Sequence, residues 1–164
     1  MIQPGEARDL LRAAGCSSSV IRHSEAVYHV ATEYAASINE ADWDLVVAGA
    51  LLHDIGRSRT HSLRHAQEGA ALCRQIGIPG PVTLIVERHL GAGLRADECT
   101  LLGLIPRDCI PIALEERIVA NADNLVRGDR RISIDERLIR SAYLPAEMRR
   151  RIYHLWVEME QFLY

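Results

Sequence analysis

Six histidines and aspartates occupy positions where a helical protein normally buries apolar side chains. They are His23, His53, Asp54, His65, His89 and Asp123. Removing such polar groups from water costs free energy unless they find a partner. A bound cation would satisfy all six together, because imidazole nitrogens and carboxylate oxygens would ligate it in place of water. The pattern therefore predicts a metal centre.

Apolar neighbours at helical spacing place these residues on inward faces. His23 lies three residues after Val20 and four before Val27, and Asp123 falls within a similar stripe. Any one of them alone is more often a hydrogen-bonded core residue than a ligand. The set of four histidines and two carboxylates is what favours a metal over separate core networks.

The other histidines provide an internal comparison. His29 and His154 share their helical faces with charged residues and are predicted to lie at the surface. His61 precedes His65 in a loop and could reach the same pocket. We prefer His65 as the ligand and leave His61 as the alternative.

Composition predicts a single compact domain of 164 residues, with 48% hydrophobic and 25% charged residues. The formal net charge of -3 makes nucleic-acid binding unlikely on electrostatic grounds. All 19 basic residues are arginine. The four cysteines form no Cys-x-x-Cys pair, and we find neither a secretory signal nor an apolar run long enough to span a membrane. We expect a cytoplasmic protein with free thiols.

Helical spacing dominates the chain, and no sustained alternation predicts a strand. The fold class is therefore all-α: one domain over residues 1–164, with motifs at about 20–126 and C-terminal helices at 134–163 packing on it. Trp43, Ile76 and Leu163 are expected on buried faces. The segment 91–111 has no helical pattern and is predicted to be a long loop, which either lines the rim of the pocket or is only a mobile connection. Helices are predicted at 4–14, from about 18 to 38, 42–54, 62–76, 81–89 and 114–126.

The order of His23, His53-Asp54 and Asp123 resembles the HD-domain phosphohydrolase superfamily, and His53-Asp54-Ile55-Gly56 resembles its HDIG form. The resemblance is to uncharacterised, archaeal-type HDIG proteins. His65 with Gly69-Ala70, followed by Arg88-His89, is also similar to bacterial symmetrical diadenosine-tetraphosphate hydrolases. The Gly-Tyr-Pro motif of cyclic-dinucleotide phosphodiesterases is absent, which argues against that activity.

This resemblance implies a helical HD-domain bundle that binds one or two divalent metals. The first metal would be held by His23, His53, Asp54 and Asp123. His65 and His89 match the ligands that two-metal subgroups add, and Asp54 would bridge the ions. Mixed nitrogen and oxygen ligands suit Fe, Mn, Co, Ni or Zn.

The implied reaction is hydrolysis of a phosphate ester or anhydride, in a nucleotide or dinucleotide, by metal-activated water. Asp54 and Arg57 are the predicted catalytic residues. Arg57, Arg88 and Arg127 are predicted to bind substrate phosphate, since each neighbours a proposed ligand. Arg130 and Arg131 are weaker candidates. The assembly state stays open between monomer and homodimer.

Three alternatives remain. The myo-inositol oxygenase group shares the architecture and uses four histidines and two aspartates at a di-iron site, so the ligands alone do not separate the two reactions. A non-enzymatic nucleotide sensor or RNA-modification accessory is the second alternative, to which the basic segment 127–131 would contribute. The third is a purely structural metal site.

Overall fold

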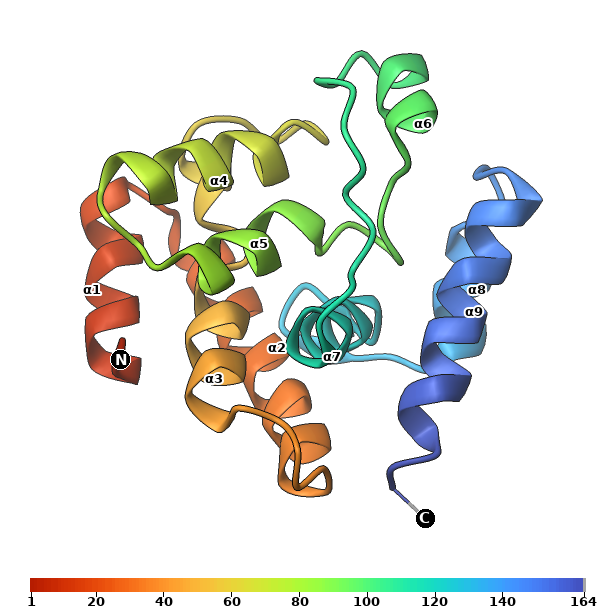
Figure 1. Ribbon diagram of the computed structural model, residues 1–164, viewed down its shortest axis with the longest axis horizontal. Helices are drawn as coiled ribbons and strands as arrows, with labels where there is room; N and C mark the ends of the chain where they lie inside the picture. The colour runs from red at the N-terminus through yellow and green to blue at the C-terminus, as the bar shows by residue number, and fades with distance from the viewer. Residues whose placement is uncertain (164) are drawn as a thin grey trace.

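Helices α2, α3 and α7 pack against one another at the centre of the molecule (Figure 1). The computed structural model describes residues 1–163. Its helices are α1 (Pro4–Ala14), α2 (Ser18–Ala36), α3 (Trp43–Leu52), the 3-10 helix η1 (Ile55–Ser58), α4 (His65–Gln75), α5 (Gly80–Arg88), α6 (Ala96–Leu101), α7 (Leu114–Asn124), α8 (Ile134–Arg140) and α9 (Ala146–Glu160). The predicted all-α class is confirmed.

Local sequence signals explain where the first helices begin and end. Pro4 occupies the first turn of α1, and Gly15 ends that helix in the left-handed conformation, with φ 88°. The hydroxyl of Ser17 accepts a hydrogen bond from the Val20 N–H and so caps α2. Asp42 caps α3 in the same way through the N–H of Leu45. These ends fix the register of the helices that carry His23 and His53.

Two apolar clusters hold the bundle together. One lies among α2, α7 and α9 and includes Val27, Ile118 and Met159. The other joins α1, α3 and α5 and includes Leu51 and Val86. In Figure 1, α1 and α9 lie on opposite sides of the central helices. The helices that carry or directly precede the proposed ligands (α2, α3, α4, α5 and α7) all contribute residues to these two clusters.

The segment 91–111 differs from the predicted loop, because it contains α6. The Glu98 carboxylate accepts from the Arg95 N–H, and the Asp108 carboxylate accepts from the Ala96 N–H, so side chains cap the start of this short helix. Leu94, Cys99 and Leu104 then form a small apolar cluster of their own. The helix was missed because its six residues are too few to establish a period.

No alternating pattern in the sequence indicated the two-stranded hairpin that the structure contains. Strand β1 (Val126–Arg127) pairs antiparallel with β2 (Arg130–Arg131), and Gly128 in the turn has φ 61°. The predicted helix 114–126 therefore ends early, at Asn124. Strands of two residues are too short to show alternation.

Three residues expected in the core lie at the surface. Trp43, Ile76 and Leu163 are 46%, 44% and 37% exposed. Each lies at or beyond a helix end, where the neighbouring helices no longer cover the side chain. None of the helices in the described chain is both long and apolar enough to cross a membrane.

Close packing of α3 on α5 depends on Gly49, because a Cβ there would lie 2.5 Å from Cδ1 of Ile85. We expect Gly49→Ala to lower the free energy of unfolding by about 1–3 kcal/mol, the usual cost of overpacking. Ile85→Val, which removes Cδ1, should recover part of this loss in the double variant. Urea denaturation measures both effects.

Gly5→Ala is the matched control, since this exposed helical glycine has open space around it. There we expect a gain of up to about 1 kcal/mol. Equal destabilisation by the two substitutions would contradict the packing argument.

Candidate metal centre

Five helical elements bring the six predicted ligands together. His23 lies in the second turn of α2, whereas His53 and Asp54 follow α3 directly. The remaining three come from the start of α4, the end of α5 and the end of α7: His65, His89 and Asp123. Residues separated by up to 100 positions in sequence thus meet at one place.

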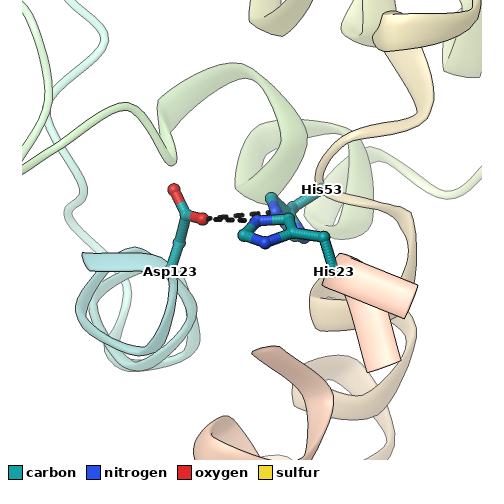
Figure 2. A group of neighbouring side chains, drawn as sticks. All are labelled: His23, His53 and Asp123. Carbon is teal, nitrogen blue, oxygen red and sulfur yellow. Dashed lines mark hydrogen bonds and ion pairs between the residues drawn. The ribbon is translucent and has the colours of Figure 1, made fainter. Parts of the chain in front are cut away.

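The first group consists of His23, His53 and Asp123, whose side chains point toward one another in Figure 2. Nε2 of His23 lies 3.0 Å from Oδ1 of Asp123, and Nε2 of His53 lies 3.5 Å from the same oxygen. Both nitrogens also lie 3.8 Å from Oδ2 of Asp54. These atoms are close enough together to share one cation.

The second group consists of His53, Asp54 and His89, with His65 beside it. Oδ1 of Asp54 lies 3.0 Å from Nε2 of His65 and 3.5 Å from Nε2 of His89. The two carboxylate oxygens of Asp54 thus face different histidines: Oδ2 faces the first group and Oδ1 faces the second.

The Nδ1 atoms of the four histidines all lie against backbone carbonyls. These carbonyls belong to Gly128, Ala50, Ser62 and Val86 for His23, His53, His65 and His89, at 2.6, 2.7, 2.7 and 2.8 Å. A carbonyl only accepts, so each Nδ1 carries the proton and donates it. In the neutral rings, Nε2 is then unprotonated, and its lone pair faces the carboxylates.

This arrangement fits a divalent metal ion. The buried Nε2 of His53 has no hydrogen-bond partner anywhere in residues 1–163. The Nε2 atoms of His65 and His89 lie 3.1 Å apart, although neither has a proton to donate when both rings are neutral. A cation between lone pairs of this kind replaces repulsion with coordination. The donor set and its orphaned nitrogen therefore match a metal site.

Burial and charge act against each other in the carboxylates. Burial raises the pKa of Asp54, but the histidine charges and hydrogen bonds outweigh it and hold that pKa well below its usual range. The pKa of Asp123 is lowered in the same way, chiefly by the hydrogen bond from His23. Both residues are therefore ionised at neutral pH and can serve as anionic ligands.

Two glycines allow α4 to approach the Asp54 turn. A Cβ on Gly56 would lie 1.9 Å from the carbonyl oxygen of His65 and 2.5 Å from the nitrogen of Gly69. A Cβ on Gly69 would in turn lie 3.0 Å from the nitrogen of Gly56. Backbone contact between η1 and α4 is what places His65 beside Asp54.

The structure separates His65 from His61. His65 is 1% exposed and adjoins Asp54, whereas His61 is exposed and its carbonyl accepts from Arg57. His29 and His154 are exposed, as their polar surroundings in sequence predicted.

The three predicted substrate arginines have different surroundings. Nε of Arg57 donates to Oδ2 of Asp54 at 2.8 Å. Arg127 is exposed and has no acidic partner in the described chain. Arg88 lies elsewhere in the network: its guanidinium donates to both oxygens of the buried Glu116, at 3.0 and 2.9 Å. That ion pair joins α5 to α7 and engages the guanidinium within the protein, and the role of Arg88 in phosphate binding stays a prediction.

Similarity to known proteins agrees with this geometry. Residues 20–128 match the HD domain family. The uncharacterized protein MJ0778 of Methanocaldococcus jannaschii is 49% identical over 125 residues, which cover 74% of each chain. A tRNA (cytidine(56)-2'-O)-methyltransferase of Thermoplasma volcanium is 45% identical over 128 residues; these cover 78% of this chain but only 38% of the relative.

The HD domain of the L. monocytogenes phosphodiesterase PgpH, solved in complex with cyclic-di-AMP, has the same fold. It superposes with a TM-score of 0.58 over 95% of this chain and 97% of the other, at 17% identity. The fold and the clustered histidines and aspartates define a helical bundle whose central side chains are consistent with divalent metal binding. The chain belongs to the HD-domain family.

Substitution of Gly69 tests the role of the η1–α4 contact. We expect Gly69→Ala to push His65 away from Asp54 and to weaken metal binding at the second group by about tenfold, the scale of lost support around a ligand. Elemental analysis after dialysis against graded metal concentrations measures this.

Gly80→Ala is the control, because a Cβ there meets nothing within 4 Å. Unchanged metal content in Gly69→Ala would refute the role of the contact.

Metal binding should depend on pH through His23. Burial acts to lower the pKa of His23, but the hydrogen bond and charge of Asp123 raise it from 6.5 to about 9. The proton must leave Nε2 before a metal binds there. We therefore expect zinc affinity to rise between about pH 6.5 and about pH 9 and then to level off, as measured by chelator competition.

Deprotonation of His23 changes the stability of the metal-free fold in the opposite direction: stability falls as the pH rises, whereas zinc affinity increases. Because the folded-state pKa is raised, the His23–Asp123 interaction stabilises the metal-free fold fully below about pH 6.5 and is lost as the pH rises through about 9. Zinc affinity independent of pH over that interval would contradict both expectations.

Proposed function

We propose that this protein is a metal-dependent phosphohydrolase that cleaves a phosphate ester or anhydride, in a nucleotide or dinucleotide. The observation that carries the proposal is the shared carboxylate of Asp54, which presents one oxygen to each histidine group. A residue placed in this way can hold two cations side by side. Paired cations are typical of enzymes that hydrolyse phosphate esters.

His23, His53, Asp54, Asp123, His65 and His89 would hold one or two divalent ions of Fe, Mn, Co, Ni or Zn. When bound, such ions activate water as a nucleophile near neutral pH and polarise phosphoryl oxygens. The hydrogen bonds from the Nδ1 atoms to backbone carbonyls keep each histidine ring in the tautomer that ligation requires. The first group is more accessible to solvent than the second. The side chains of His23 and Asp123 are 17% and 21% exposed, whereas those of the other four residues are at most 4% exposed.

Two arginines are suited to bind the substrate phosphate. Arg57 orients Asp54 through Nε, and its side chain remains 30% exposed, so its terminal nitrogens can also meet solvent or substrate. Arg127 is exposed and directly precedes Gly128, whose carbonyl contacts His23. Guanidinium groups in these places would neutralise phosphate charge as the reaction proceeds.

A second candidate is an accessory role in RNA modification. It is favoured by the relatives from Thermoplasma volcanium and Picrophilus torridus, both tRNA (cytidine(56)-2'-O)-methyltransferases, in which the matched region is 38% and 37% of a longer protein. In that role the metal centre would organise a binding surface without turnover. The ion pairs that neutralise Arg130 and Arg131 count against a strong RNA-binding surface.

Hydrolysis of candidate substrates, followed by chromatography of the nucleotide products, provides the test, because diadenosine tetraphosphate and cyclic-di-AMP can be cleaved without release of inorganic phosphate. Purified protein, loaded with each candidate metal in turn, is assayed without oxygen on mononucleotides, diadenosine tetraphosphate and cyclic-di-AMP. We expect turnover with at least one compound, and we expect Asp54→Asn to reduce it by at least about a hundredfold, because a neutral amide is a poor bridging ligand. Circular dichroism should show nearly unchanged helix content.

Asp9→Asn, on the exposed side of α1, is the matched control and should keep full activity. Turnover that survives in Asp54→Asn would overturn the proposed mechanism. Turnover that appears only when the same assay is repeated in air would favour the oxygenase alternative. Absence of turnover together with specific tRNA binding would favour the accessory role.

A further inference from the structure

His23 differs from the other three proposed histidine ligands in how its ring is held. His53 and His89 follow helix ends, where free carbonyls are available, and each uses the carbonyl three residues earlier. His65 does the same at the turn that precedes α4. His23 lies within α2, where nearby carbonyls accept the N–H groups of the helix itself. Its Nδ1 must therefore find an acceptor elsewhere.

That acceptor is the carbonyl of Gly128, 105 positions later and 2.6 Å from Nδ1. Gly128 belongs to the turn between β1 and β2 and has φ 61°, the left-handed region that favours glycine. A Cβ at this position would meet nothing within 4 Å, so only the backbone conformation restricts the residue. The direction of the carbonyl thus depends on the turn geometry that glycine permits.

Ion pairs also link the β1–β2 hairpin to α2, the helix that carries His23. Asp129 forms an ion pair with Arg22 of α2 at 3.5 Å. Arg131 pairs with Glu33, about three turns further along the same helix. Arg130 pairs with Glu136 of α8. These contacts, from the turn and from β2, link the hairpin to α2 and α8.

We propose that the β1–β2 turn is a positioning element for the first metal group and that Gly128 is its positioning residue. Its carbonyl accepts the hydrogen bond from Nδ1–H of His23 and so leaves Nε2 as the nitrogen that is aimed at Asp123 and available to a metal. This inference rests on the proposed metal-binding function. The second group requires only His53, Asp54, His65 and His89, whose supporting carbonyls lie elsewhere, so it is independent of the turn.

The test compares Gly128→Asn, Gly128→Ala and Gly128→Val. Asparagine enters the left-handed region most readily of the three and valine least, while none of the side chains meets a neighbour at Cβ. We expect Gly128→Asn to bind zinc like the wild type. Gly128→Val should lose about ten- to a hundredfold in affinity at one of two sites, and Gly128→Ala should lie between them. Zinc titration of each full-length variant measures this order.

Nitrogen NMR of the histidine rings in the zinc-loaded protein adds a readout that a general loss of stability would not move. The wild type and Gly128→Asn should show an Nδ1-protonated, Nε2-ligated His23, and Gly128→Val should lose that signature while the signals of His65 and His89 persist. Wild-type affinity and an unchanged His23 signal in Gly128→Val would overturn the inference but leave the proposed function standing. A wild-type protein that binds no metal would overturn both. If Gly128→Val does not fold, the Gly128→Ala comparison decides by the same criteria.

Discussion

The structure depends on a concentration of negative charge that its interior cannot hold unaided. Asp54 and Asp123 stay ionised in a largely buried place, and the buried Nε2 of His53 beside them has no hydrogen-bond partner among residues 1–163. A positive charge at the centre is the arrangement that satisfies these groups together. The helices pack as they do around this requirement, with apolar clusters on either side of the ligands and close glycine contacts where α4 meets the Asp54 turn.

Sequence periodicity predicted the main helices and the residues that meet at the centre, because both follow from which helical faces are buried. The first helix was predicted with the bounds Pro4–Ala14. The choice of His65 over His61 also agrees with the burial observed. Inward histidines and aspartates were visible because they interrupt apolar stripes, a pattern that one helix at a time is sufficient to reveal.

Features that depend on contacts between distant segments were not predictable in this way. Arg88 follows the same sequence logic as Arg57, yet its charge is taken by Glu116, 28 residues later. The carbonyl of Gly128 reaches His23 across 105 residues and belongs to a hairpin too short to show a period. In the sequence, the segment 127–131 indicated only a basic patch. Nothing in it indicated which side chain the turn would support.

Because the proposed ligands differ in exposure, the two groups would differ in how readily they take up and release a metal ion. The first group meets solvent through His23 and Asp123, while the side chains of His65, His89 and Asp54 are almost completely covered. If both groups hold an ion, the one at the inner position would be reached by way of the outer one, since His53 belongs to both groups. Loading and release would follow a fixed order, last in and first out. The inner ion would persist as a resident of the fold while the outer one exchanges with its surroundings.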